Sequence, residues 1–154
     1  MKAIIFSDSH RRFNPMYEAV EREGGIDYII HAGDVVEDAE ELAVAYPRRS
    51  VIYVCGNNDF WHRDVPDDRF FTLDGVKIFL THGHNYGVKY SAAKVKQHAL
   101  QLGADICIFG HTHSAVCEQE GGFCLFNPGT PSGSYGILET NGGKFDIRLV
   151  QNDR

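Results

Sequence analysis

The 154-residue chain has no apolar run approaching the roughly 20 residues that a membrane-spanning helix needs. We also expect no signal peptide, since Met1 and Lys2 lead directly into a segment with the pattern of a core strand. Its four cysteines, at positions 55, 107, 117 and 124, form no C-x-x-C pair and lie within strand-like segments. These absences predict a soluble, cytoplasmic protein with reduced, buried thiols, no membrane partner and no structural zinc site.

Basic clusters are also scarce. The formal net charge is −6, the sequence pI is about 5.7, and Arg11-Arg12 and Arg48-Arg49 are the only basic doublets. Long nucleic acids are bound through clustered Lys and Arg, so the sequence predicts no extended nucleic-acid groove. A small anionic substrate remains compatible with this charge balance. No Ser-His-Asp pattern of a nucleophilic hydrolase is apparent.

Five short apolar segments are rich in β-branched or aromatic residues, and each of them ends in a polar side chain. They span residues 2–8, 27–34, 50–57, 76–82 and 105–111. Their length and composition predict buried parallel strands. Helices are predicted at 14–23, 37–45 and 91–102, where Asn14 with Pro15, and Ser91, have the residue types of helix starts. The apolar face of the third helix consists of Ala92, Val95, Ala99 and Leu102.

The C-terminal part has a different pattern. Short runs at 114–120, 123–126, 134–139 and 144–150 are separated by glycine-containing turns, and Asn141-Gly142-Gly143 is a strong hairpin signal. They predict an antiparallel meander that adds a second sheet or extends the first. We therefore predict one α/β domain over residues 1–154, an αββα sandwich of two mostly β-sheets flanked by helices. Residues 57–72 are predicted to form a long polar loop, a lid or an interface in which Phe60 and Trp61 are exposed.

Seven side chains with oxygen or imidazole donors lie where the predicted strands end. They are Asp8, His10, Asp34, Asn57, His82, His111 and His113. In open α/β sheets, ligands bind at the carboxyl ends of the strands, so these donors should meet. One such residue alone would more often be a turn residue or a helix cap. All seven together predict a metal site, in which one shared carboxylate holds a pair of divalent cations.

The motifs Asp8-x-His10, Gly33-Asp34, Gly56-Asn57-x-Asp59, His82 after a strand, and Gly110-His111-x-His113 occur in this order. Together they resemble the calcineurin-like metallophosphoesterases, particularly their compact bacterial and archaeal phosphodiesterases. The resemblance implies that one metal is held by Asp8, His10, Asp34 and His113. It implies that the other is held by Asp34, Asn57, His82 and His111, with Asp34 as the bridge. Mn²⁺ is the expected metal, and Ni²⁺, Co²⁺, Fe²⁺ and Zn²⁺ suit the same donors.

The resemblance also implies a reaction. A hydroxide activated by the two metals would attack a small phosphodiester in line, so the protein would be a hydrolase of phosphoric ester bonds. Asn58 stands where larger relatives carry a histidine that contacts the phosphate. An amide donates a hydrogen bond but delivers no proton, so good leaving groups should be preferred unless another residue serves as the acid. His84 is the candidate acid, with a supporting or solvent-exposed role as the alternative. Asp34, Asn58 and His84 are thus the predicted catalytic residues.

Other residues near the motifs have weaker assignments. Arg11 and Arg12 are candidates to hold a substrate phosphate, although arginines at such positions are often only solvated. Asp59 would orient a ligand histidine or cap its loop. His31 is expected to pack at a strand end, and the remaining two histidines, at positions 62 and 98, are expected at the surface.

Two alternatives to a phosphodiesterase remain open at this point. One is a non-catalytic binding scaffold of the same fold, like the retromer subunit that resembles these enzymes. The other is a hydrolase of phosphomonoesters or nucleoside polyphosphates. The intact ligand set favours an enzyme with a small phosphate-ester substrate, and a homo-oligomer is compatible with the exposed aromatic residues of the long loop.

Overall fold

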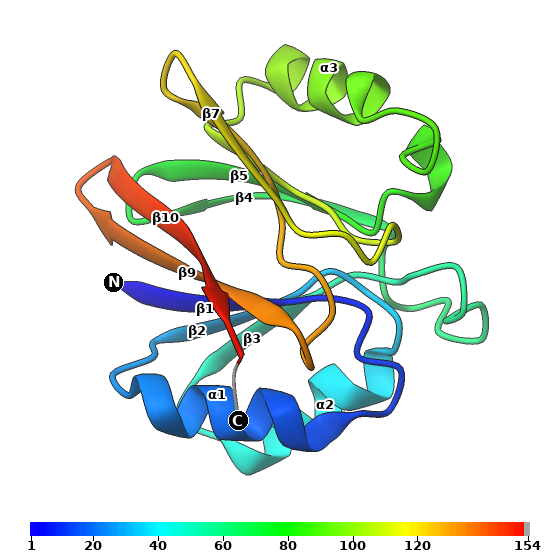
Figure 1. Cartoon of the computed structure of the whole chain (residues 1–154), viewed down its shortest axis with the longest axis vertical. Helices are drawn as coiled ribbons and strands as arrows, with labels where there is room; N and C mark the ends of the chain where they lie inside the picture. The colour runs from blue at the N-terminus through cyan, green and yellow to red at the C-terminus, as the bar shows by residue number, and fades with distance from the viewer. Residues whose placement is uncertain (153–154) are drawn as a thin grey trace.

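The computed structural model describes residues 1–152 as four layers, helix, sheet, sheet and helix (Figure 1). Two five-stranded sheets lie face to face, with strand orders β10-β9-β1-β2-β3 and β4-β5-β6-β8-β7. Helices α1 and α2 cover the outer face of the first sheet, and α3 covers the second. The predicted αββα sandwich is confirmed.

The strands of the first sheet are β1 (Lys2–Phe6), β2 (Tyr28–His31), β3 (Ser50–Tyr53), β9 (Ser134–Asn141) and β10 (Lys144–Gln151). Those of the second are β4 (Asp68–Leu73), β5 (Val76–Thr81), β6 (Ile106–Ile108), β7 (Val116–Glu120) and β8 (Phe123–Asn127). The helices are α1 (Phe13–Glu23), α2 (Val36–Ala45) and α3 (Ala93–Leu102), with a 3₁₀ turn, η1 (His84–Tyr86), before α3.

Both sheets are mixed. β2 runs parallel to β1 and β3, and β6 runs parallel to β5 and β8. The C-terminal strands are divided between the sheets, because β7 pairs antiparallel with β8 in the second while β9 and β10 extend the first beside β1. Parallel strands joined by helical crossovers have their carboxyl ends at one edge, so the loops that follow them converge there.

The prediction that residues 57–72 form one long loop is wrong for residues 68–72. Residues from Asp68 onward form the edge strand β4, which pairs antiparallel with β5. Its buried face carries Phe71 and Leu73, whereas Phe70 and Thr72 are exposed. An edge strand that places one face in solvent contains polar residues, and this is why the segment resembled a loop.

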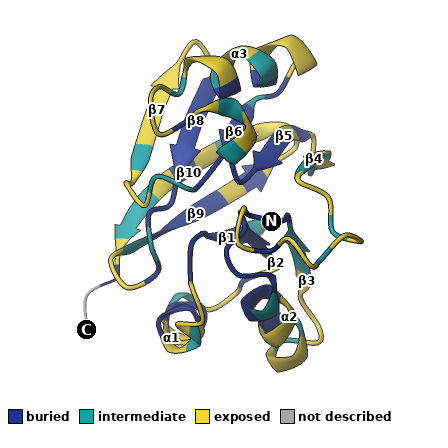
Figure 2. Ribbon diagram, turned by 90° about the vertical axis from the view of Figure 1, so that its right-hand side faces the viewer, coloured by how far each residue is buried: buried dark blue, intermediate teal, exposed yellow. Residues whose placement is uncertain are grey.

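The core between the sheets is a single apolar cluster that includes Ile5, Ile30, Leu80, Ile108 and Phe126, all fully buried. Full burial of side chains of this size contributes about 1.5–3 kcal/mol each. Figure 2 shows the buried strands enclosed by exposed helix faces and loops. This rigid two-sheet core fixes the positions of the strand ends.

Several local predictions need correction. α1 begins at Phe13, so Asn14 lies inside its first turn and is not the cap. α3 begins at Ala93, two residues later than predicted, and the backbone N–H of Ala93 donates to Ser91 Oγ at 3.1 Å. Leu102, which was predicted to lie on the apolar face of this helix, is 40% exposed.

Three of the four cysteines are buried as predicted, and Cys117 on the edge strand β7 is exposed. All four are free thiols. Within residues 1–152, no helix is long and apolar enough to span a membrane.

Candidate metal centre

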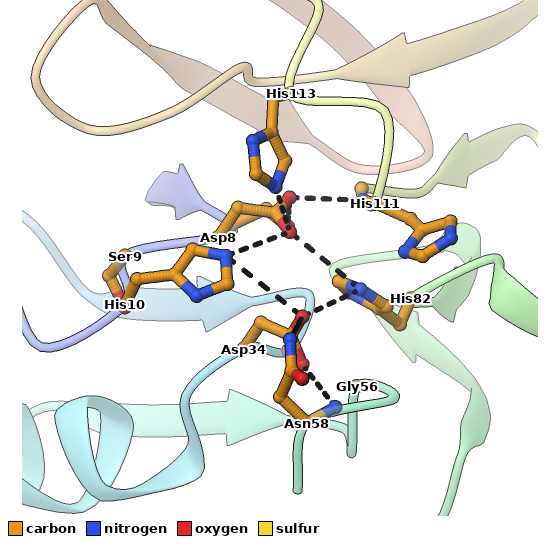
Figure 3. A network of polar contacts seen from close by, with 12 residues as sticks. Asp8, Ser9, His10, Asp34, Gly56, Asn58, His82, His111 and His113 are labelled. Carbon is orange, nitrogen blue, oxygen red and sulfur yellow. Dashed lines mark hydrogen bonds and ion pairs between the residues drawn. The ribbon is translucent and has the colours of Figure 1, made fainter. Parts of the chain in front are cut away.

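Two buried carboxylates form the centre of the predicted site. Asp8 follows β1 and Asp34 follows β2, and the two residues are only 2% and 1% exposed. His82, which directly follows β5 in the other sheet, lies between them and is fully buried. Its Nε2 lies 3.3 Å from Asp34 Oδ2 and 3.7 Å from Asp8 Oδ1 (Figure 3). The facing strand ends of both sheets therefore contribute to one site.

Two further histidines approach from the solvent side. His113 Nε2 lies 3.3 Å from Asp8 Oδ1, and His10 Nε2 lies 3.9 Å from Asp8 Oδ1 and 4.0 Å from Asp34 Oδ2. Their side chains are 51% and 38% exposed. Donor atoms of Asp8, His10 and His113 lie within 4.8 Å of one another, as do those of Asp8, Asp34 and His82. We call these five residues the carboxylate–histidine cluster.

The donor atoms fit a cation. Asp8 Oδ1 and His82 Nε2 are buried and, within the described part of the chain, have no hydrogen-bond partner. Buried polar atoms are nearly always paired, because an unpaired one loses its hydration without compensation. A cation accepts lone pairs from both a carboxylate oxygen and an imidazole nitrogen, so it would satisfy these two atoms together.

The other polar atoms of the same two side chains are fixed by the protein. Ser7 Oγ donates to Asp8 Oδ2 at 2.6 Å, and the backbone N–H of His111 donates to the same oxygen at 3.0 Å. His82 Nδ1–H donates to the carbonyl oxygen of Ala32 at 2.7 Å. This last bond places the His82 lone pair on Nε2, toward the carboxylates, as in metal-binding histidines.

Electrostatics at the cluster favour positive charge. Burial alone would raise the pKa of Asp34, but the adjacent His82 ring and two hydrogen bonds from Asn58 outweigh it and hold that pKa well below its usual range. Burial disfavours protonation of His82, yet the carboxylates of Asp34 and Asp8 raise its pKa above the usual value. The cluster thus stabilises a cation at its centre.

The backbone of the ligand loops adopts an uncommon conformation. Five of the seven predicted ligands have φ between 45° and 71°: Asp8, His10, Asp34, His111 and His113. Such values are uncommon outside glycine and cost free energy that surrounding contacts must offset. Here the N–H of Asp8 donates to the carbonyl of Gly33, and that of His10 donates to the carbonyl of Asp34. The two loops therefore hold each other in place.

Glycines allow these loops to approach closely. A Cβ on Gly56 would collide with the Asp34 carboxylate, and one on Gly110 would collide with Ser7 Oγ. The Gly-Asn and Gly-His pairs of the motifs are thus explained by packing around Asp34 and Asp8, and Gly33 of the Gly-Asp pair by close contact with the backbone of Gly56.

Two predicted ligands lie apart from the cluster. The His111 ring packs edge-on against the ring of His82, with centroids 5.1 Å apart. Asn57 is exposed, and the neighbouring Asn58 instead contacts Asp34 through its backbone N–H and its side-chain amide. The structure brings five of the seven predicted ligands together and places the His111 ring at their edge, whereas the Asn57 side chain forms no hydrogen bond with them within residues 1–152.

Asp59 supports the loop and does not orient a ligand histidine. Its carboxylate accepts hydrogen bonds from the backbone N–H groups of Asp34, Val36 and Gly56 at 2.8–3.0 Å. The loop-cap interpretation of this residue is therefore correct, and the orienting role is wrong.

Two supporting residues were missed by the sequence analysis. Ser7 fixes Asp8, as described above, and Asp38 fixes the loop that follows Asp8. The buried Asp38 carboxylate accepts hydrogen bonds from Ser9 Oγ and from the backbone N–H of Arg11. Asp38 has the position of an ordinary acidic residue in the first turn of a helix, so only the fold reveals this role.

His31 is buried at the end of β2, as predicted. Its Nδ1 accepts from the N–H of Gly33, and its Nε2 lies 2.9 Å from Ser9 Oγ. Burial, aided by the nearby His82, lowers the pKa of His31 to about 3, so its ring is neutral.

His84 is half-buried in η1, and its Nδ1 is buried without a hydrogen-bond partner among residues 1–152. Burial and the neighbouring His82 lower its pKa below the usual value. His84 and Asn57 both line a pocket of about 540 Å³ beside the cluster, together with Phe60. The histidines at positions 62 and 98 are partly buried, and the first pairs with Glu37 through Nε2 at 2.8 Å.

On the opposite side, a cleft of about 270 Å³ opens onto the cluster. We call it the central cleft, and its walls are Asp8, Ser9, His10, Arg12, His113, Thr130, Pro131 and Ser132. Arg12, but not Arg11, lines this cleft. The cluster is therefore accessible to a small molecule through the central cleft.

Comparison with known proteins agrees with this geometry. The family model of the calcineurin-like phosphoesterase superfamily domain matches residues 1–143. Probable metallophosphoesterase YsnB of Bacillus subtilis is 34% identical over 131 residues, which cover 84% of this chain and 75% of the relative. Phosphodiesterase MJ0936 of Methanocaldococcus jannaschii is 29% identical over 166 residues, covering 91% of this chain and 93% of the relative.

Solved structures share the fold. A predicted phosphoesterase from Streptococcus pneumoniae aligns with a TM-score of 0.78 and 26% identity, over 98% of this chain and 89% of the other. Vps29 of Entamoeba histolytica, solved in complex with zinc, aligns with a TM-score of 0.77 and 20% identity, over 99% of this chain and 100% of the other. The likeness to Vps29 concerns the fold alone.

Proposed function

Because this chain belongs to the calcineurin-like phosphoesterase superfamily, we propose that it hydrolyses small phosphodiesters with two divalent cations bound at the carboxylate–histidine cluster. The observation that carries the proposal is the pair of buried, unpartnered atoms Asp8 Oδ1 and His82 Nε2 beside a second buried carboxylate. A protein without a cation at this position would bury these atoms at a cost and gain nothing.

The proposed ligands are those implied by the motifs, with Asp34 as the bridge. One ion would be held by Asp8, His10, Asp34 and His113, and the other by Asp34, Asn57, His82 and His111. The described geometry supports five of these residues directly. Imidazole and carboxylate donors without a thiolate suit Mn²⁺, our expected metal, and also Ni²⁺, Co²⁺, Fe²⁺ and Zn²⁺.

When bound, two such ions lower the pKa of water and polarise phosphoryl oxygens, which supplies a nucleophile at neutral pH. The protein's own contribution is positioning. Ser7 and the backbone of His111 fix Asp8, and the carbonyl of Ala32 fixes His82, so little reorganisation is needed when substrate binds. Two divalent ions would bring four positive charges, of which Asp8 and Asp34 neutralise only two. The site would therefore attract anions although the protein as a whole is acidic.

The leaving group requires a proton unless it is intrinsically good. Asn58 lies at the cluster and can donate an amide hydrogen bond to a phosphoryl oxygen, but its amide is not a useful acid. His84 lines the pocket beside the cluster and is our candidate acid. Its lowered pKa keeps most of the ring neutral at pH 7, so any acid role should be strongest on the acidic side of neutrality.

A non-catalytic scaffold is the second candidate, because the fold is shared with Vps29. The buried ligand set favours the enzyme, since a scaffold has no physical need for it. A monoesterase or nucleoside polyphosphate hydrolase is the third candidate, because a metal pair alone does not select the ester type. Asn58 favours diesters with good leaving groups. A cytoplasmic location and a homo-oligomeric state remain predictions.

The test is a substrate panel with protein reconstituted with Mn²⁺. The panel comprises bis(p-nitrophenyl) phosphate, cyclic nucleotides, dinucleotides, glycerophosphodiesters and phosphomonoesters. We expect the highest kcat/KM for diesters. Turnover of monoesters alone would contradict the diester assignment, and no turnover of any ester with metal bound would favour the scaffold. His84→Gln should reduce kcat for alkyl leaving groups more than for p-nitrophenol, and equal effects on both would reject His84 as the acid.

A further inference from the structure

A second pocket, which His84 does not line, adjoins the central cleft. It has a volume of about 590 Å³, and we call it the arginine pocket. Its walls are Arg11, Arg12, Phe13, Asn14, Pro15 and Ser132. Arg12 and Ser132 also line the central cleft, so the two hollows share one wall. A molecule with one end in the cleft can extend directly into the arginine pocket.

The charge of this pocket is positive and is not compensated locally. None of the residues that line it is acidic. Within residues 1–152, neither Arg11 nor Arg12 forms an ion pair with a carboxylate, and both residues are exposed. In a chain of net charge −6, these two adjacent arginine side chains give the pocket a local positive charge. Guanidinium groups bind phosphate through paired hydrogen bonds.

The backbone that carries the arginines is held in a fixed position. The N–H of Arg11 donates to the buried Asp38 carboxylate at 2.8 Å, and the N–H of Arg12 donates to the carbonyl of Ser9 at 2.9 Å. Arg11 has φ of 69°, an uncommon value that these contacts maintain. The same Asp38 carboxylate holds Ser9 Oγ, next to the ligand His10. The positions of the arginines are therefore coupled to those of the metal ligands.

The two sides of the cluster differ in charge. The pocket beside His84 includes two carboxylates, Asp59 and Asp67, and one cation, Arg63, in its walls, whereas the arginine pocket has only cationic and neutral walls. A second anionic group on the substrate would be repelled from the first and attracted to the second. Phe13 and Pro15 add an apolar wall to the arginine pocket, which suits a sugar or a base adjoining that anionic group.

Resting on the proposed function, we infer that the preferred substrate is a phosphodiester that carries a second phosphate group, which binds in the arginine pocket. A 5′-phosphorylated short oligonucleotide has this chemistry. The scissile diester then lies at the carboxylate–histidine cluster, and the departing group lies toward His84. Arg11 and Arg12 are thereby specificity residues that contact the terminal phosphate and not the reacting one.

The test compares two substrates that differ in one group, the dinucleotide of two adenosines with and without a 5′-phosphate. With protein reconstituted with Mn²⁺, we expect kcat/KM to be at least about tenfold higher for the phosphorylated dinucleotide, mainly through KM. The double variant Arg11→Gln/Arg12→Gln should reduce this ratio to about one. The control is Arg48→Gln/Arg49→Gln, which changes the other basic doublet. This doublet precedes the amino end of β3, whereas the site lies beyond the carboxyl end, so this variant should keep the wild-type ratio.

A binding measurement keeps the inference testable without turnover. Calorimetry of the phosphorylated dinucleotide with metal-free protein in EDTA should give a Kd at least about fivefold weaker for Arg11→Gln/Arg12→Gln than for the wild type. Equal affinities, or a wild-type kcat/KM ratio near one while bis(p-nitrophenyl) phosphate is hydrolysed, would overturn the inference. Failure to hydrolyse any diester, with arginine-dependent binding retained, would instead overturn the proposed function.

Discussion

Asn58 donates two hydrogen bonds to Asp34, from its backbone N–H to Oδ1 at 3.0 Å and from its side-chain amide to Oδ2 at 2.9 Å. The motif assigns the metal-ligand role to the preceding residue, Asn57, which is exposed. The two N–H groups of Asn58 occupy one lone pair on each Asp34 oxygen, so they compete with the ions for the bridging carboxylate. Metal binding at Asp34 should therefore displace Asn58 and turn Asn57 toward the cluster.

This displacement should be visible in the fluorescence of Trp61, the single tryptophan of the chain. Trp61 lies in the same loop, and its ring N–H donates to Glu37 at 2.9 Å. Titration of metal-free protein with Zn²⁺ should change the Trp61 emission, and the change should saturate with ion binding. In Asp34→Asn the change should be lost. Constant emission in the wild type, while calorimetry records ions binding, would rule out the loop movement.

Asn58→His should restore a proton donor beside the reacting phosphate. General acid catalysis contributes about 10²–10⁴-fold when the donor is well placed, so even an imperfect placement should raise kcat for alkyl leaving groups about tenfold. Diesters of p-nitrophenol need little protonation and should respond much less. The measurement is kcat for matched alkyl and p-nitrophenyl diesters. A uniform change for both classes would indicate altered binding in place of proton donation.

Acid should destabilise the metal-free protein partly through His31. The folded ring has a pKa of about 3, whereas a histidine in the unfolded chain titrates near 6.5. Below pH 6.5 the unfolded chain therefore binds a proton that the folded protein does not, and stability falls down to about pH 3. The contribution is about 1.4 kcal/mol per pH unit in this window.

His31→Gln removes the titrating group and should flatten this part of the curve. Urea unfolding of both proteins in EDTA between pH 7 and 4 gives the difference directly. Parallel curves for the wild type and the variant would show that His31 is protonated in the folded state.

Gly110→Ala should damage the site through Asp8. The added methyl group would meet Ser7 Oγ and lie 2.8 Å from Asp8 Oδ2, so the carboxylate must shift. We expect a loss of about 1–3 kcal/mol in the free energy of unfolding, as in overpacked cores, together with weaker metal binding. Gly133→Ala is the matched control, since its nearest contact would be 3.7 Å. Equal stability of the two variants would contradict the packing account.

The sequence predicts the buried strands well because their signal is local. Runs such as Ile4-Ile5-Phe6 and Ile29-Ile30 are apolar on both faces, and only a covered strand explains them. Edge strand β4 was missed because Asp68, Arg69 and Thr72 interrupt its apolar run. The division of the C-terminal strands between two sheets depends on long-range pairing, such as Ile4 with Ile137, which no local pattern encodes.

The candidate site is likewise predicted only in part from the sequence. Strand-end motifs predict that Asp8, Asp34 and His82 meet, because parallel strands bring their carboxyl ends to one edge. Sequence spacing does not predict which of two adjacent asparagines contacts Asp34, nor that Asp38 holds the loop after Asp8. Those outcomes depend on loop conformations with positive φ and on glycines packed against carboxylates, which only the assembled fold determines.

The most direct measurement is metal content combined with anomalous scattering, for wild-type protein and Asp34→Asn after incubation with Mn²⁺. We predict two ions per wild-type chain at the carboxylate–histidine cluster, and at most one ion with no diester hydrolysis in Asp34→Asn. Asn58→Ala, which leaves the proposed ligands intact, should retain both ions. Wild-type protein that binds no ion at the cluster, or Asp34→Asn that keeps two ions and full turnover, would contradict the account.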